Sequence, residues 1–95
     1  MRGWAKMRIV VTIVGKDAVG ITAKVSGLLA DNGVNILNIN QNILDGFFNM
    51  VVVADMATAS VSLQELKEKA TILGKQIGVE IRAQHEDIFT AMHSI

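Results

Sequence analysis

Two segments of this chain are apolar at almost every position, and they constrain the fold more than any other feature. These segments are Met7–Val14 and Phe47–Asp55. Segments of this length and composition are typical of strands buried on both faces of a sheet. Two others, Asn35–Ile43 and Val79–Gln84, alternate apolar and polar residues, as strands with one solvated face do. The sequence therefore predicts two central strands and two edge strands.

Two segments between these strands have the apolar periodicity of helices. The first covers Val19–Asn32 and ends at Gly33, which is expected in the left-handed conformation. The second begins at Ser62, where Ser62 and Glu65 form a capping box, and it ends at Gly78. Its buried stripe is predicted to be Leu63, Leu66, Ala70, Leu73 and Ile77.

The order of these elements is β-α-β-β-α-β, which is the ferredoxin-like arrangement of the α+β class. Asp45-Gly46 favours a type I′ turn between the second and third strands. Right-handed crossovers give a four-stranded antiparallel sheet with strands one and three in the middle and both helices on one face. Residues 86–94 are predicted to form a short tail helix, so 7–95 make one domain, and 1–6 are expected to be a disordered extension.

The second face of the sheet has no predicted cover. Val10 and Val14 of the first strand are expected to face outward there. A chain of 95 residues buries a smaller share of its surface than larger domains do. We therefore expect a second copy of the chain to cover this face, with the tail helix as another contributor.

Composition excludes several functional classes. Nine basic residues balance nine acidic ones, which argues against nucleic-acid binding and against polybasic membrane attachment. The longest apolar runs, such as Met50–Ala54, are far shorter than the roughly 18 residues of a membrane span. The chain has no cysteine, so it has no thiol nucleophile or thiolate metal site, and a cytoplasmic location is expected. No cofactor is expected.

The segment from Gly15 to Thr22 follows a strand and opens a helix, as a Walker A loop does. Ile21 stands where that motif requires lysine, so nucleotide hydrolysis is disfavoured. The free amides of the first helical turn could instead hold a small anion. Equally, Gly20 could allow close packing while Asp17 caps the helix.

Other catalytic and binding patterns are weak. Asp45–Val51 only faintly resembles an RNA-binding signature, so Phe47 and Phe48 are expected in the core or at an interface. His85 and His93 lack the spacing of metal ligands. No nucleophile has an adjacent base. The sequence therefore indicates a protein that is not an enzyme.

The second strand carries polar residues that could have a role in binding. Gln41 shares the phase of Leu37, Ile39 and Ile43 and should face the helices, where its amide needs a backbone partner or a ligand. Asn35 and Asn38 stand at the start of the strand. Their amides could hold the carboxylate and ammonium groups of an amino acid, or could belong to turn chemistry.

The segment Asp17–Ile36 resembles the signature of ACT domains, which are small β-α-β-β-α-β regulatory modules that bind amino acids. The resemblance extends over about Arg8–Gln84. It is strongest to uncharacterised single-domain ACT proteins of bacteria and archaea, with glycine-cleavage regulatory proteins more distant. Most ACT domains regulate an attached enzyme or DNA-binding domain, and none is expected here, because the resemblance accounts for most of the 95 residues.

The resemblance implies a ligand between two subunits, held by the loop after the first strand and by the neighbour's second strand. The corresponding residues here are Asp17, Ala18, Val19, Gly20, Ile21, Asn35 and Asn38. Val19 replaces a proline that many ACT domains have before the glycine, which leaves the loop less rigid.

We therefore expect a cytoplasmic homodimeric regulator that binds an amino acid or a similar small metabolite, with a regulated enzyme or transcription factor as its partner. The alternative is a ligand-independent protein-interaction or regulatory subunit. Acylphosphatase-like hydrolysis is disfavoured, because the first loop offers Lys16 but no arginine for phosphate.

Overall fold

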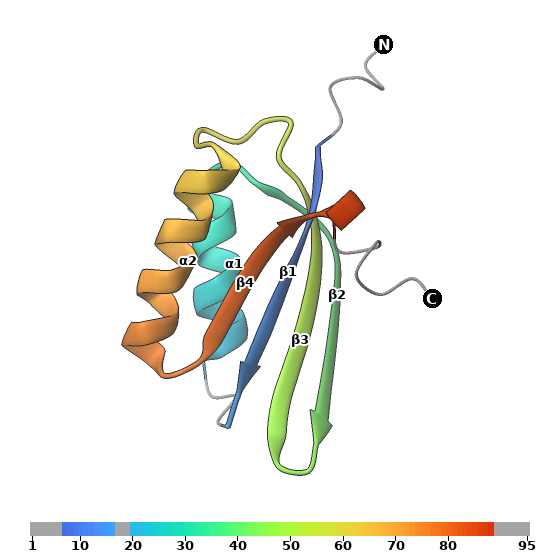
Figure 1. Cartoon of the computed structure of the whole chain (residues 1–95), viewed down its shortest axis with the longest axis vertical. Helices are drawn as coiled ribbons and strands as arrows, with labels where there is room; N and C mark the ends of the chain where they lie inside the picture. Colours follow the sequence, from blue (N-terminus) through green and yellow to red (C-terminus); the bar gives the residue numbers. More distant parts are fainter. Residues whose placement is uncertain (1–6, 17–19, 89–95) are drawn as a thin grey trace.

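The computed structural model of the chain describes residues 7–16 and 20–88. Its elements are β1 (Arg8–Gly15), α1 (Ile21–Asp31), β2 (Asn35–Leu44), β3 (Phe47–Asp55), α2 (Leu63–Ile77) and β4 (Glu80–His85) (Figure 1). The strands form one sheet in the order β2-β3-β1-β4, and all neighbours are antiparallel. The predicted fold, with β1 and β3 in the middle, is confirmed.

The ends of the chain are described only in part. Helical residues begin at Glu86, directly after β4, and are described as far as Ile88. The remainder of the predicted tail helix, His93 and the predicted extension 1–6 lie outside the described residues.

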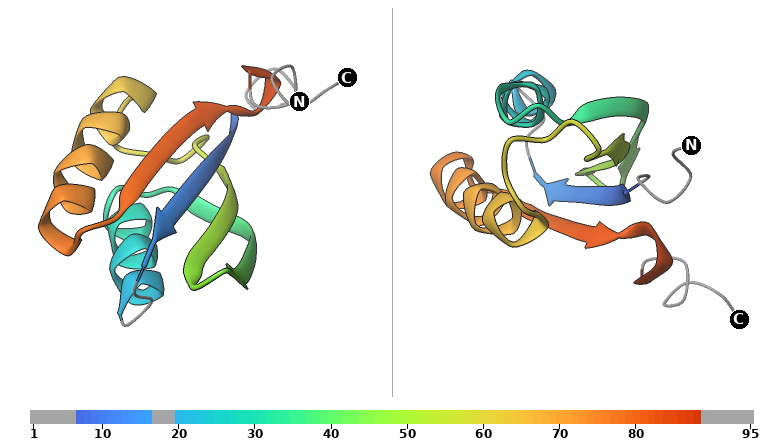
Figure 2. Two further views of the ribbon diagram at one scale, coloured as in Figure 1. Left: turned by 60° about the horizontal axis from the view of Figure 1, so that its bottom comes forward. Right: turned by 90° about the horizontal axis from the view of Figure 1, so that it is seen from above.

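The core lies between the sheet and the two helices, which cover the same face of the sheet (Figure 2). Alternate residues of the central strands point into it, because successive side chains of a strand point to opposite faces. The buried residues of β1 and β3 are Ile9, Val11, Ile13, Phe48, Met50, Val52 and Ala54. Both helices add buried residues, namely Ile21, Val25, Leu29, Leu66 and Ala70. Phe48 is thus a core residue, as predicted.

The opposite face of the sheet, which we call the open face, carries the alternate set of side chains. The register places Val10 and Val14 of β1 on it, beside Val53 and Asn49 of β3. Val10 is only 4% exposed in the single chain, whereas Val14 is 42% exposed. Val10 is therefore already covered within one chain, whereas Arg8 and Val14 are exposed and Thr12 is half-buried. Cover of the rest of this face by a second copy stays a prediction.

A β-bulge changes the pattern predicted for β2. Ile36 pairs with Ala54 and Asn38 pairs with Val53, so Leu37 is the extra residue between them. Leu37 is 44% exposed, while Ile36 and Ile39 pack against the core. The prediction that Leu37 shares the inward face with Ile39 is therefore wrong, because a bulge shifts the alternation by one residue.

Gln41 has the predicted phase but not the predicted burial. It pairs with Met50, whose side chain is in the core, yet Gln41 is exposed. The reason is that β2 lies at the edge of the sheet and that the hairpin extends past the helices (Figure 1). Gln41 is therefore not the buried amide that its position in the sequence suggested.

The tip of the β2–β3 hairpin is exposed and apolar. Asp45 and Gly46 both have positive φ, 51° and 81°, as the predicted type I′ turn requires. Ile43, Leu44 and Phe47 beside the turn are 69%, 57% and 43% exposed. Phe47 is thus not a core residue, and the tip is available for contact with another molecule.

The start of α2 has the predicted capping box. The Ser62 hydroxyl accepts from the Glu65 amide at 3.1 Å, and the Ser62 amide donates to Glu65 Oε1 at 2.9 Å. The hydrogen bonds from the Ser62 backbone and side chain lower the pKa of Glu65. A lowered folded pKa means that the carboxylate stabilises the fold above its unfolded pKa and that this contribution is lost as the pH falls. Gly78 ends the helix at φ 74°.

We expect Ser62→Ala to lower the free energy of unfolding by about 1 kcal/mol, because the amide of Glu65 loses its acceptor. In a domain of this size that corresponds to a fall in the melting temperature of about 4–8 °C. Thr71→Ala is the control, because its exposed hydroxyl bonds only the Lys67 carbonyl within the helix. Equal melting temperatures for the two variants would contradict a role for the cap.

Candidate functional site

The loop side of the predicted site lies at the start of α1. Gly20 is the N-cap residue, with φ 73° and no side-chain cap, and the helix begins at Ile21 rather than at the predicted Val19. A Cβ at Gly20 would meet nothing within 4 Å, so Gly20 is not there for close packing. The amides of the first turn have no intrahelical acceptors, and they favour an anion.

Of the predicted loop residues, the structure describes Gly20 and Ile21. Asp17, Ala18 and Val19 lie outside the described residues. The Ile21 side chain is 2% exposed and belongs to the core. Ile21 could therefore offer a ligand only its backbone.

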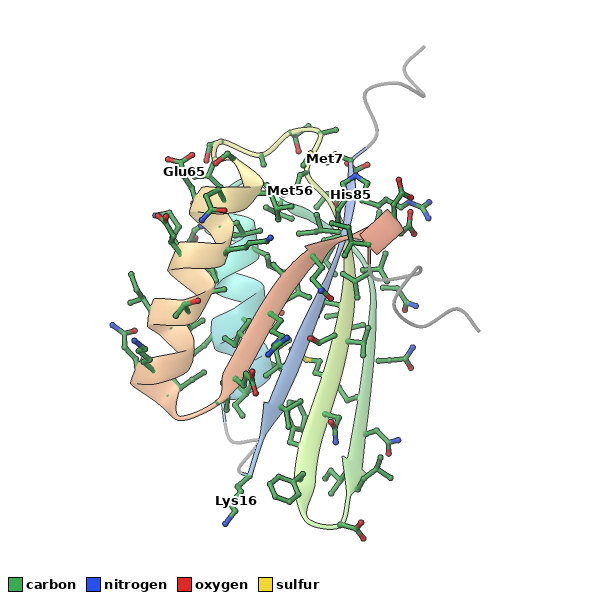
Figure 3. The ribbon with its side chains drawn as sticks, in the orientation of Figure 1. Met7, Lys16, Met56, Glu65 and His85 are labelled. Atoms are coloured by element: carbon green, nitrogen blue, oxygen red, sulfur yellow. The ribbon has the colours of Figure 1, made fainter. Side chains whose placement is uncertain are left out.

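Close packing instead involves Gly15, at the end of β1. A Cβ there would overlap Cγ1 of Val79, so a side chain at this position would have to displace Val79. Gly15 is buried and Lys16 follows it, exposed at this end of the sheet (Figure 3).

The strand side of the site is shaped by the bulge. Asn35 pairs with Asp55 and Asn38 pairs with Val53, and these two β3 residues share one face. Asn35 and Asn38 are three residues apart, so in a regular strand they would point to opposite faces. The bulge at Leu37 turns both exposed amides to the open face, which the sequence pattern did not reveal.

One chain does not bring the two sides together. β1 and β2 are both antiparallel to β3, so they run in the same direction and the loop after β1 lies at the far end from Asn35. The helix between the two sides, α1, has 11 residues and is about 16 Å long at 1.5 Å per residue. Figure 3 shows Lys16 at one end of the sheet and Met56, which follows Asp55, at the other.

The outer edge of β2 has an unusual composition. Its ten residues, NILNINQNIL, include no charged side chain, and all but Ile36 and Ile39 are exposed. Exposed edge strands usually carry charges or proline that prevent pairing with another chain. This edge lacks both, and its register is disturbed only by the bulge.

A separate groove lies between the two helices. It has a volume of about 470 Å³ and is lined by Lys24, Leu28, Asp31 and Lys69, among others. Gly20, Ile21, Asn35 and Asn38 do not line it. This groove is therefore distinct from the described residues of the predicted site.

The described residues show no metal or acid–base constellation. No three His, Asp or Glu side chains within 7–16 and 20–88 are grouped to hold a metal ion. His85 Nδ1 accepts from the Asp87 amide at 3.1 Å, so it caps the helical residues that follow β4. No helix in the described part of the chain is long and apolar enough to cross a membrane.

Comparison with known proteins gives a consistent result. The sequence profile of the ACT domain matches residues 7–84. A UPF0237 protein of Clostridium perfringens is 46% identical over 94% of this chain and 100% of its own length. A UPF0237 protein of Methanocaldococcus jannaschii is 43% identical over 93% and 98%. Among solved structures, an ACT domain protein from Streptococcus pneumoniae has a TM-score of 0.79 and 36% identity, covering 87% of this chain and 93% of that one. The predicted resemblance to single-domain proteins of bacteria and archaea is confirmed.

Proposed function

Because the chain belongs to the ACT domain family, we propose that it is a non-enzymatic cytoplasmic regulator that binds an amino acid or a similar small metabolite between two copies of itself. The binding residues are the first-turn backbone of α1 with Gly20 and Ile21 in one copy, and Asn35 with Asn38 in the other. Asp17, Ala18 and Val19 belong to the same proposed loop. A regulated enzyme or transcription factor is the proposed downstream partner.

One observation carries the proposal, namely the relative direction of β1 and β2. Both run antiparallel to β3, so β2 ends at the same end of the sheet as the loop after β1. If two β2 edges pair antiparallel, the start of one β2 lies beside the end of the other. Asn35 of each copy then lies at the end of the joined sheet where the partner's loop after β1 lies. Pairing thus brings the loop of one copy and Asn35 of the other to the same end of the joined sheet, where the first-turn amides of α1 lie on the helix-covered face (Figure 2) and the Asn35 and Asn38 side chains lie on the open face.

The composition of β2 supports this mode of pairing. Its outer edge offers unpaired backbone groups, and the absence of charge along Asn35–Leu44 removes the usual barrier to strand addition. Leu37, Ile43 and Leu44 add apolar side chains that are 44%, 69% and 57% exposed. Burial of these side chains in a pair stabilises it by about 25 cal/mol per Å² of apolar surface.

The chemistry of the two sides suits an amino acid. The free amides after Gly20 donate to a carboxylate, and the helix dipole favours its charge. The side-chain oxygens of Asn35 and Asn38 accept from an ammonium group, and their amide nitrogens donate. Because the bulge turns both amides to one face, they can bind the same small molecule.

The ligand regulates the pair through differential affinity. A molecule that contacts both copies stabilises the geometry in which both sides meet, and it shifts the population toward that geometry. A partner protein that prefers the same geometry then binds more tightly, by the same coupling free energy.

Calorimetry and thermal shift with each of the common amino acids at millimolar concentration test the proposal. A ligand at a hundred times its dissociation constant stabilises the fold by about 2.7 kcal/mol, and the melting temperature rises accordingly. If none of the amino acids changes the melting temperature or releases heat, direct sensing of this class is wrong. A partner protein found by pull-down whose binding does not change when amino acids are added would support the ligand-independent alternative. Hydrolysis of an acylphosphate by the chain would contradict both the ligand-binding proposal and this alternative.

Gly20→Val is expected to abolish ligand binding while the chain stays folded. The new side chain has free space, since nothing lies within 4 Å of its Cβ, but φ at +73° is strained for valine. The relaxed backbone no longer presents its first-turn amides to the carboxylate. Gly78→Val is the matched control, with φ +74° and equally open space. Equal ligand affinity in the two variants would remove Gly20 from the site.

A further inference from the structure

A groove separate from the proposed ligand site follows α2 and β4, and we call it the α2–β4 groove. Two adjoining depressions of about 250 and 370 Å³ make it up, and both are lined by Thr71, Ile81 and Arg82. Figure 1 shows α2 alongside β4. Ile81 and Ala83 give it a buried apolar lining. Among the described strands, β4 has no neighbour on its outer side.

The charged side chains on the α2 side of this groove are basic, namely Lys67 and Lys75. Glu80 and Arg82 of β4 pair with Val14 and Thr12 of β1, so their side chains point to the open face, where Glu80 accepts from Arg82 Nε at 3.1 Å. The groove therefore has an excess of positive charge, in contrast to the uncharged edge of β2 at the other side of the sheet.

We propose that the α2–β4 groove binds an extended acidic segment of a partner protein, which adds to the sheet as a strand beside β4. Backbone groups on the outer edge of β4 supply the main-chain hydrogen bonds, as in other cases of strand addition. Alternate side chains of the added strand then point toward α2, where the basic residues select acidic ones. The groove lies at the opposite edge from β2, so it stays open in the proposed dimer.

The spacing of the α2 residues specifies the partner further. Lys67, Thr71 and Lys75 are four residues apart and so form one row along the helix. Lys67 and Lys75 are about 12 Å apart along the axis at 1.5 Å per residue. Residues four apart in a strand are about 13 Å apart and share one face. The bound segment therefore carries acidic residues at positions i and i+4, with a residue between them at i+2 that meets Thr71.

A displayed library of random peptides of about nine residues tests this surface on the full chain. We expect the selected peptides to carry Asp or Glu at i and i+4 and to bind Lys67→Glu/Lys75→Glu at least about tenfold more weakly. The matched control is Lys24→Glu/Lys69→Glu, which makes the same change in charge in the groove between α1 and α2. This control should bind the selected peptides as the unchanged chain does.

Amide chemical shifts then locate the bound peptide. We expect the largest shifts at residues 80–84 and along the Lys67–Lys75 row, and loss of binding when alternate peptide nitrogens are methylated. Selection of peptides without the acidic pair, shifts confined to other surfaces, or equal binding by the two charge variants would overturn the proposal. So would pairing of β4 with a second copy, seen as a higher mass that Lys67→Glu/Lys75→Glu leaves unchanged.

Discussion

A chain with Asn40→Lys and Asn42→Lys is expected to be a monomer that does not bind the ligand. The middle of β2 falls at Ile39 and Asn40, so full-length antiparallel pairing sets position 40 opposite Ile39 of the other copy and within one residue of the other copy's position 40, which brings like charges together at the centre of the pair. Like charges at an interface cost several kcal/mol, which raises the dissociation constant of the dimer by more than about a hundredfold. Light scattering should then give 10.3 kDa instead of twice that mass.

The fold should survive this change, because Asn40 and Asn42 are exposed and surface substitutions usually change stability by less than about 0.5 kcal/mol. Gln64→Lys/Gln76→Lys is the matched control, since it adds the same charge at exposed positions of α2. It should remain a dimer with full ligand affinity. A dimer that persists in the β2 variant would show that the copies pair elsewhere, such as through the open face.

Gly33→Ala is expected to lower the free energy of unfolding by about 2–4 kcal/mol, a large part of the total for a small domain. Gly33 follows α1 at φ +73°, and a Cβ there would stand 2.6 Å from the carbonyl oxygen of Thr58. The left-handed conformation costs alanine about 1–2 kcal/mol, and the clash with a backbone atom adds a cost of similar size. Chemical denaturation measures the sum.

The connection between α1 and β2, which contains Gly33, is held to the segment 57–61 by several hydrogen bonds. The two segments therefore cannot separate to relieve the clash without breaking these bonds. The Ser60 amide donates to the Asn32 carbonyl at 2.9 Å, and Thr58 Oγ1 donates to the Gly33 carbonyl at 2.9 Å. Gly78→Ala separates the two effects, because Gly78 also follows a helix at φ +74° but has nothing within 4 Å of the added Cβ. If both variants lose the same stability, packing against Thr58 has no role.

Most of the fold could be predicted from local patterns. The capping box at Ser62, the Asp45-Gly46 turn and the left-handed Gly33 are set by residues close in sequence. The central positions of β1 and β3 follow from apolar side chains on both of their faces. Such features need no knowledge of distant contacts.

Features that depend on tertiary context could not be predicted. The bulge at Leu37 has no turn residue to mark it, and it alone puts Asn35 and Asn38 on the same face. Gln41 was expected to be buried, but its exposure depends on how far the hairpin extends past the helices. The low exposure of Val10, 4%, likewise depends on the whole fold. Of the candidate site, the sequence identified the residues but not that one chain keeps its two sides apart.

The most direct test of the central claim is complementation between two defective chains, measured by calorimetry with the amino acid that gives the largest response. One chain carries Gly20→Val, which disables the loop side, and the other carries Asn35→Ala/Asn38→Ala, which disables the strand side. Each alone should bind nothing. A site shared between copies predicts that mixing restores about a quarter of the wild-type capacity, because half of the dimers are mixed and each has one intact site of two. A mixture that binds no more than its separate components would contradict a site formed by two copies.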